Sequence, residues 1–543
     1  MKTIKGKLID IIQKRIYDAA MQIEHGRIAN IEKIKKPQEH YIMPGFVDSH
    51  VHIESSMLNP SEFSKLAIQH GTIATVSDPH EIANVCGIAG VEYMIKDAEK
   101  SPLKMYFNAP SCVPATDFET SGHVLNSKDI ATLMKKDKIV ALGEMMNFPG
   151  VINNDPEVYA KIKASLNLNK PVDGHAPEVT GKDVEKYINA GISTDHECAS
   201  LNEALEKVKK GMIIQIREGS AAKNFDALHS LLSSHPDKCM LCTDDSHPDD
   251  LKHGHINKIV ARAMKAGHNL FDVLRAASLN AATHYKLNVG MLQPGDPADF
   301  IVVDSLENFN VISAYINGEL VFDNGRVLFQ VDKTEPINNF LLSSHLSPKA
   351  FEITSDGSRF KIIQAYDGSL LTNMFEHSLP KINGKLKPDP LSGINKITVI
   401  NRYVENPKPA VAFVQGFGIN RGAIASTVAH DSHNIVAVGV DDESIAKVAN
   451  KLIDTKGGLA LTDGSEVYHL PLPVGGLMSS DSGDMVAEAY KALNKYSSEI
   501  GCSLNAPFMT MAFMALLVIP KLKISDKGLF DVTSFSLTTL EAD

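Results

Sequence analysis

Cysteine is scarce in this sequence, with six residues in a chain of 543. Small secreted domains that lack a large hydrophobic core depend on a dense disulfide framework, which six widely spaced cysteines cannot build in so long a chain. We therefore expect reduced thiols throughout. The positions are 86, 112, 198, 239, 242 and 502.

Long hydrophobic runs are also missing. The longest apolar stretch, "MTMAFMALLVIP" near the C-terminus, is well short of the ~20 residues that a membrane-spanning helix needs. The first residues, "MKTIKGKLIDIIQKR", carry too many charges for the apolar core of a signal peptide. We predict a cytoplasmic protein without a membrane partner.

Blocks of positive charge are the third absence. The basic pieces are as short as "KIKK" and "MKKDK", and the formal net charge is −11. A surface that follows a phosphate backbone needs clustered Lys and Arg, so we expect no nucleic-acid partner. The chain is longer than the ~250–300 residues at which single hydrophobic cores stop growing, which predicts several domains.

Eight short apolar runs alternate with amphipathic segments after residue 45. This alternation predicts an α/β fold with a (β/α)₈ TIM-like barrel over residues 46–287. A doubly wound sheet is the alternative, but no glycine-rich phosphate loop follows any of the runs. The runs are "GFVDSHVHI", "TIATVSDPH", "KMYFNAPSC", "KIVALGEMM", "PVDGHAP", "GISTDHE", "GMIIQIREG" and "KCMLCTDDSH".

The segments on either side of the barrel read as short strands with turn glycines. We expect residues 1–45 and 288–329 to pair as one small β-sandwich, built from both flanks of the barrel. Residues 330–543 mix strand and helix patterns, as in "NKITVINRY" and "IVAVGVDDESIAKVANKLI". They predict a separate C-terminal α+β domain.

Polar side chains stand at one consistent place, the C-terminal end of the runs. In a (β/α)₈ barrel these ends form a single face, which is where active sites are found. An ordinary hydrogen-bonding role would explain any one of these polar residues alone. It would not explain why polar residues recur at the same end of successive runs. The residues are His50, His52, Asp78, His80, Glu144, His175, His196, Glu218 and Asp244.

The set contains the donors of a metal centre. His50 and His52 are two apart on a strand, so their imidazoles point to the same face. Imidazole and carboxylate suit Zn²⁺, Mn²⁺, Fe²⁺ or Co²⁺, and with His175 and His196 the set exceeds what one catalytic metal needs. We predict two metals bridged by Glu144. Asp244 is then left to bind one metal and to take a proton from the attacking water, which the metals convert to hydroxide.

These motifs resemble the amidohydrolase superfamily, and within it the adenine deaminase family. The superfamily features are the H-x-H after the first strand, single histidines on the fifth and sixth strands, the Asp on the eighth, and "VGMLQPGDPADFIVVD". The more specific matches are "MPGFVDSHVHIESSM", "SDPHEIANV", "GEMMNFPGV", "DGHAP", "STDHECAS", "REGSAAKN", "CTDDSHPDDL" and "GHINKIVARAM". "QGFGINRGAIASTVAHDSHNIVAVG" and "PFMTMAFMALLVIPKLKISDKGLFDV" are similar to the extra C-terminal domain of the family, so the resemblance covers essentially the whole chain.

The resemblance implies hydrolysis of adenine to hypoxanthine and ammonia with two divalent ions, Mn²⁺ or Fe²⁺, in purine salvage. The metal ligands would be His50, His52, Glu144, His175, His196 and Asp244. Asp78, His80 and Glu218 would bind the purine or move protons, whereas Arg217 and Asp245 would anchor loops. We expect adenine and water as the small-molecule partners, and a homo-oligomer.

Two other functions remain open. One is a different amidohydrolase reaction, either hydrolysis of a cyclic amide or deacetylation of an amino sugar. Enzymes that share this fold can differ in substrate because their loops differ. A carboxylated lysine bridge would favour cyclic amides, and the fourth run offers Glu144 instead. The other is a non-catalytic scaffold, which the intact ligand set argues against.

Three further motifs have weaker support. "HIE" and "CMLC" echo a zinc deaminase signature, but Lys238 replaces its proline and the two pieces lie far apart. "KHGH" places His253 and His255 in a predicted loop, where substrate-side or surface histidines are common. "AHDSHN" in the C-terminal region, with His430, Asp431 and His433, is either an auxiliary metal site, a segment that reaches the barrel mouth, or a polar turn.

Overall fold

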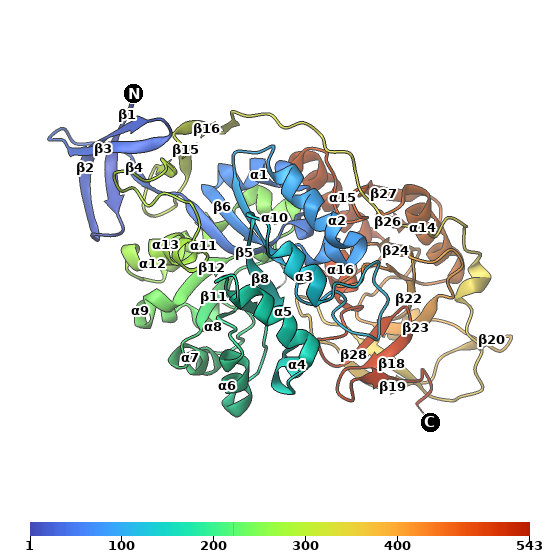
Figure 1. Cartoon of the computed structure of the whole chain (residues 1–543). Helices are drawn as coiled ribbons and strands as arrows, with labels where there is room; N and C mark the ends of the chain where they lie inside the picture. Colours follow the sequence, from blue (N-terminus) through green and yellow to red (C-terminus); the bar gives the residue numbers. More distant parts are fainter. Residues whose placement is uncertain (221, 543) are drawn as a thin grey trace. The chain divides into compact units, whose positions relative to one another are not determined.

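The computed structural model describes residues 1–220 and 222–542 and divides the chain into two compact units (Figure 1). The first unit contains residues 1–79, 92–111 and 126–334. The second contains residues 80–91, 112–125 and 335–543. The second unit therefore takes two short segments from within the sequence of the predicted barrel.

The barrel strands are short, buried and parallel to their neighbours. Two sheets, in the orders β13-β5-β6-β7-β8-β9 and β10-β11-β12, contain them. Each predicted apolar run forms one strand, except that the eighth is split in two at Thr243. The strands are β5 Phe46–His52, β6 Thr72–Ser77, β7 Lys104–Ala109, β8 Ile139–Met145, β9 Val172–Gly174, β10 Thr194–Asp195, β11 Ile213–Arg217, β12 Cys239–Cys242 and β13 Asp244–Asp245.

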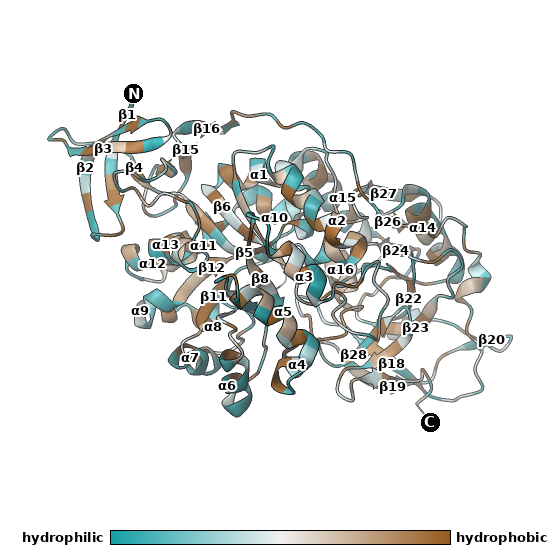
Figure 2. Cartoon of the chain, viewed as in Figure 1, coloured by the Kyte–Doolittle hydropathy of each residue, from teal (hydrophilic) through white to brown (hydrophobic). Residues whose placement is uncertain are grey.

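Amphipathic helices connect these strands. Figure 2 shows hydrophobic colouring along β11 and β12 and hydrophilic colouring over the outer helices α6 and α7. Helix α1 begins at Pro60, because the Asn59 side chain accepts a hydrogen bond from the Glu62 amide and proline suits the first helical turn. The main helices are α1 Pro60–Gln69, α2 His80–Ala98, α3 Ser127–Leu133, α5 Pro156–Leu166, α6 Gly181–Asn189, α7 Leu201–Lys209, α10 Pro248–His253, α11 Ile256–Lys265, α12 Leu270–Ala276 and α13 Leu279–His284.

The two flanks of the barrel form one continuous eight-stranded sheet in the order β17-β16-β15-β14-β4-β1-β2-β3. Strand β4 joins the flanks, since it pairs in parallel with β1 and antiparallel with β14, where Met43 lies opposite Ile301. The strands are β1 Lys2–Asp10, β2 Arg15–Glu24, β3 Arg27–Lys33, β4 Tyr41–Pro44, β14 Phe300–Val303, β15 Val311–Ile316, β16 Glu319–Asp323 and β17 Arg326–Val327.

The second unit is built on another eight-stranded sheet, in the order β19-β18-β23-β22-β25-β24-β26-β27. Helix α14, Asp442–Thr455, packs its apolar face against this sheet around Ile435 and Ala460. Among the described residues, no helix is long and apolar enough to cross a membrane. The strands are β18 Phe360–Gln364, β19 Asn373–His377, β22 Ile394–Ile400, β23 Ala410–Gln415, β24 Ala423–Ser426, β25 Ile435–Gly439, β26 Gly458–Thr462 and β27 Val467–Pro471.

Several more elements of the second unit follow β27 in sequence. A small sheet near the C-terminus has the order β28-β29-β30. Its strands and the helices before it are α15 Gly483–Glu499, α16 Pro507–Phe513, β28 Leu522–Ser525, β29 Gly528–Asp531 and β30 Ser536–Leu537.

Candidate metal centre

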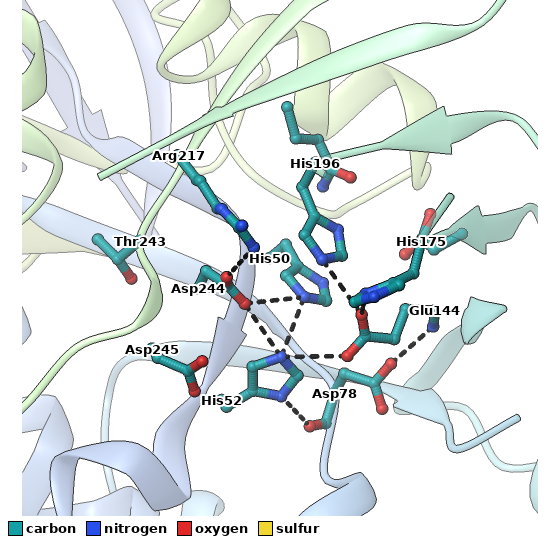
Figure 3. Close-up of polar contacts among 12 residues, drawn as sticks. His50, His52, Asp78, Glu144, His175, His196, Arg217, Thr243, Asp244 and Asp245 are labelled. Carbon is teal, nitrogen blue, oxygen red and sulfur yellow. Dashed lines mark hydrogen bonds and ion pairs between the residues drawn. The ribbon is translucent and has the colours of Figure 1, made fainter. Parts of the chain in front are cut away.

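The predicted ligands converge at the C-terminal ends of the barrel strands (Figure 3). His50 and His52 lie on the same face of β5, and their Nε2 atoms are 3.2 Å apart. The His50 ring also stacks on that of His196, with 4.2 Å between the ring centroids. All three side chains are buried.

Glu144, near the end of β8, lies between two groups of histidines. Its Oε1 atom is 3.3 Å from Nε2 of His52. Its Oε2 atom is 2.7 Å from Nδ1 of His175 and 3.1 Å from Nε2 of His196. The two oxygens therefore face different imidazoles, as a bridging carboxylate between two cations requires.

Asp244 approaches the same centre from the opposite side in Figure 3. Beside the strand break at Thr243, the backbone of Asp244 lies in the left-handed region, with φ of 57°, which non-glycine residues seldom adopt. Its Oδ1 atom is 3.5 Å from Nε2 of His50 and 3.2 Å from Nε2 of His52. The unusual backbone thus turns this carboxylate into the centre.

These donors fit divalent metals. Ligand atoms lie within 4.8 Å of one another in three overlapping groups: His50, His196 and Asp244; His50, His52 and Glu144; and Glu144, His175 and His196. Neutral imidazoles and ionised carboxylates are the set that borderline divalent cations such as Zn²⁺, Mn²⁺ and Fe²⁺ accept. The groups share His50, His196 and Glu144, so the donors form one continuous cluster.

The electrostatics of the centre favour ionised carboxylates. Burial alone would raise the pKa of Glu144, but the imidazoles of His175, His196 and His52 hold it well below its usual range. Burial likewise opposes ionisation of Asp244, while the Arg217 guanidinium and the imidazoles of His50 and His52 keep its pKa well below normal. Both carboxylates are therefore ready to bind cations near neutral pH.

Asp78, at the end of β6, positions two of the ligands. Its backbone carbonyl lies 2.9 Å from Nδ1 of His52, and this contact leaves Nε2 directed at the centre. Its Oδ2 atom accepts a hydrogen bond of 2.8 Å from the Glu144 amide. The structure thus places Asp78 behind the ligands.

Glu197 and Arg217 extend the site beyond the predicted residues. Arg217, at the end of β11, donates through Nη1 to Oδ2 of Asp244 at 2.6 Å and through both Nη atoms to Glu197. Glu197 Oε1 lies 3.4 Å from Nε2 of His196. Our sequence reasoning gave Arg217 only a loop-anchoring role and passed over Glu197. The only feature of the sequence that could have indicated these two residues is that each is adjacent in sequence to a candidate site residue.

A buried network supports the centre from behind. Asp48 of β5 accepts hydrogen bonds from the amide and the hydroxyl of Thr243, at 3.1 and 2.5 Å. Nε2 of His255 lies 3.2 Å from Oδ2 of the same carboxylate, and its Nδ1 atom lies 2.6 Å from the Thr72 hydroxyl. His255 is therefore part of a brace linking β5, β6 and the end of β12.

The structure does not bring every predicted residue to this cluster. Glu218 pairs with Arg262 and lines a separate cavity of about 270 Å³. His80 is the first residue of α2 and is buried. His253 is exposed, and Cys239 and Cys242 are buried in β12.

Comparison with known proteins agrees with a metal-dependent hydrolase. Residues 41–321 match the amidohydrolase family, and residues 369–536 match the adenine deaminase C-terminal domain. Adenine deaminase of Methanosarcina mazei is 49% identical over 556 residues, covering 100% of both chains. Those of Sulfurovum sp. (strain NBC37-1) and Borreliella burgdorferi are 52% and 48% identical, each covering 98% of both chains. The chain belongs to the adenine deaminases of the amidohydrolase family.

Proposed function

We propose that the protein hydrolyses adenine to hypoxanthine and ammonia at the barrel centre, in the cytoplasm. The observation that carries this proposal is the position of Glu144, whose two oxygens face separate groups of histidines while Asp244 faces His50 and His52. We further propose that the centre holds two Mn²⁺ ions, with Fe²⁺ as the alternative. We also propose that the protein forms a homo-oligomer.

The ligand side chains would hold the metals in two sets. His50, His52 and Asp244 would bind one ion, His175 and His196 the other, and Glu144 would bridge them. When bound, divalent ions lower the pKa of water so that hydroxide is available near neutral pH. Every ligand except the partly buried His175 is almost fully buried, which strengthens each electrostatic interaction in the centre.

Asp244 is the proposed proton carrier. Deamination joins a water oxygen to carbon 6 of adenine and breaks the bond from that carbon to the exocyclic nitrogen. One water proton must pass to the ring or to the departing amine, which leaves as ammonia. Asp244 touches the ligands of one metal and is ionised, so it can accept this proton and return it to the leaving group. Of the three residues predicted to hold the purine or assist proton movement, we retain His80, while Asp78 would act by positioning His52 and Glu144 and Glu218 lines a separate cavity.

The test uses Mn²⁺-reconstituted protein and a panel of substrates at equal concentration. Adenine should be converted to hypoxanthine, followed by the ultraviolet change, faster than adenosine or cytosine. A buried pocket rejects ribose by size, and unpaired polar groups penalise a wrong base by several kcal/mol. Hydrolysis of a cyclic amide or an acetylated amino sugar, with adenine inert, would contradict the proposal. Faster turnover of adenosine would contradict the base-only pocket.

A further inference from the structure

Glu197 is a largely buried carboxylate that lies at the metal centre but outside the ligand sets proposed above. Its Oε1 atom is 3.4 Å from Nε2 of His196 and 3.6 Å from Nδ1 of His175. The same two nitrogens face Oε2 of Glu144, at 3.1 and 2.7 Å. Two imidazole nitrogens and two carboxylate oxygens therefore converge, and Figure 3 shows the side chains of His175, His196 and Glu144 among them.

A turn after β10 brings His196 and Glu197 to the same side. Successive side chains of an extended strand point to opposite faces, so two neighbours could not both reach one ion from a strand. Strand β10 ends at Asp195, whose Oδ1 atom accepts a hydrogen bond of 3.1 Å from the Glu197 amide. This is the turn that an aspartate side chain forms with the amide two residues on. The buried Lys207 donates to the same carboxylate at 2.6 Å and so fixes the turn from behind.

The spacing of Glu197 from the two imidazoles matches a shared ion better than a hydrogen bond. Hydrogen-bonded nitrogen and oxygen atoms lie about 2.7–3.2 Å apart, and both contacts of Glu197 are longer. Ligand atoms about 2.0–2.2 Å from a tetrahedral ion stand about 3.3–3.6 Å from one another. The observed 3.4 and 3.6 Å fall in this range. The Glu197 oxygen thus lies where a further ligand would lie.

The contact with Arg217 leaves Glu197 able to bind a cation. Arg217 donates through Nη1 to Oε1 and through Nη2 to Oε2, the latter at 2.9 Å. Each carboxylate oxygen has two lone pairs, so Oε1 can accept this hydrogen bond and still bind an ion. Ionised Glu144, Asp244 and Glu197 bring three negative charges to the centre, and Arg217 balances one of them. Buried charges are paired or coordinate metals, and the other two suit divalent cations.

We propose that Glu197 is a ligand of the second ion, together with His175, His196 and Glu144. Two imidazole nitrogens and two carboxylate oxygens suit Mn²⁺, Fe²⁺ or Zn²⁺. This assignment rests on the two-metal centre proposed above, but it does not depend on which substrate the enzyme hydrolyses.

Arg217 would then link the ligands of both ions. Its guanidinium donates to Asp244, a proposed ligand of the first ion, at 2.6 Å, and to Glu197. The competing role for Glu197 is only to hold Arg217 in place. The two roles differ in their effect on metal binding, because Arg217 itself binds no ion.

The direct test is the anomalous scattering of Mn²⁺ in crystals of the full-length protein reconstituted with Mn²⁺ alone. A peak beside His175 and His196, with a Glu197 oxygen about 2.0–2.2 Å from it, is the expected result. The same peak with both Glu197 oxygens beyond about 3 Å overturns the assignment and leaves the two-metal centre intact. The absence of a peak beside these histidines overturns both. This measurement needs no variant and so does not depend on how substitutions fold.

Metal binding in solution separates the two roles of Glu197. In Mn²⁺ titrations of the full chain, Glu197→Gln should weaken binding of the second equivalent by about tenfold or more, because a ligand is lost. Arg217→Met removes the guanidinium but keeps the Glu197 carboxylate, so both equivalents should bind with near wild-type affinity. Glu185→Gln is the control for the substitution, since Glu185 pairs with Lys210 on the surface of the same unit. Equal affinities in Glu197→Gln and wild type, or equal losses in Glu197→Gln and Arg217→Met, would overturn the assignment.

Discussion

At the scale of single residues, Asp244 faces two kinds of partner. One oxygen lies against His50 and His52, and the other accepts from Arg217. Because the carboxylate is both a proposed ligand and a proton carrier, Asp244→Asn should lower kcat by ~10² or more, the scale of general acid–base catalysis. Steady-state kinetics on protein with verified metal content measures this. Near-normal kcat in a fully metallated Asp244→Asn enzyme would remove Asp244 from that role.

Arg217 acts through Asp244 and Glu197, so it is a positioning residue. Its planar guanidinium donates from separate nitrogens to two carboxylates, a geometry that lysine cannot reproduce. We expect Arg217→Lys to lower kcat roughly tenfold or more with little change in KM, and Arg217→Met to lower it further. The ranking of the two variants, measured at equal metal occupancy, is the readout. Equal activity of Arg217→Lys and wild type would show that donation from two separate guanidinium nitrogens is not needed for turnover.

The metal-ligand candidates were visible in the sequence, whereas their supporting residues were not. Alternation along a strand is enough to place His50 and His52 on one face. Arg217 is a long side chain that reaches from β11 to β13, and its partners lie 20 and 27 positions away. No local pattern encodes such a contact, because it depends on the order of strands around the barrel.

At the scale of elements, the His255 brace holds three strands behind the metal ligands. The imidazole contacts Thr72 of β6 and Asp48 of β5, and Asp48 in turn binds Thr243 beside Asp244. His255→Ala removes one buried partner from Thr72 and one from Asp48, so we expect a loss of about 1–3 kcal/mol in the free energy of unfolding. We also expect Mn²⁺ affinity to fall by about 10-fold or more.

His253→Ala is the matched control, because His253 belongs to the same "KHGH" motif and is exposed. Denaturant unfolding and Mn²⁺ titration should leave this control near wild type. Identical Mn²⁺ affinity in His255→Ala and His253→Ala would show that the brace does not support metal binding.

The elements themselves were largely predictable. Each of the eight apolar runs forms a strand, since buried parallel strands have continuous apolar sequences. The break at Thr243 was not predicted, because it results from the left-handed conformation of Asp244 and not from glycine or proline. The same sequence pattern would have suited an unbroken strand.

At the scale of the whole molecule, stability should depend on pH through Lys523. This side chain is fully buried in the second unit and donates to the carbonyls of Leu370 and Phe513, at 2.9 Å each. Burial lowers its pKa from 10.5 to about 7. Below pH 7 both the folded and unfolded chains carry the proton, and the cost of burying the charge is present in full.

Between about pH 7 and 10.5 the unfolded chain binds more protons at Lys523 than the folded chain. The free energy of unfolding should therefore rise with pH in this window, by at most about 1.4 kcal/mol per pH unit from this group. Lys523→Met should remove this contribution, as measured by denaturant unfolding at several pH values. Lys521→Met, at an exposed position, is the control. An unchanged slope in Lys523→Met would show that the lysine titrates alike in the folded and unfolded chains.

The division into units was harder to predict than the barrel. The sequence suggested a contiguous C-terminal domain from residue 330, whereas the second unit also takes residues 80–91 and 112–125. Helix α2 runs from His80 to Ala98, is kinked at Gly87, and contains residues of both units. Which core a helix joins depends on tertiary packing that a local pattern does not encode.

The pairing of β4 with β14 also has a consequence for synthesis on the ribosome. Strands β1 to β4 are made first, but the edge of β4 that pairs with β14 has no partner until Phe300–Val303 is translated. At ~5–20 residues per second, the roughly 250 intervening residues take ~10–50 s. Through that interval the nascent chain presents an open strand edge, which is a template for pairing with other chains. Translation speed and chaperone supply should therefore affect the yield of this protein through its first 45 residues.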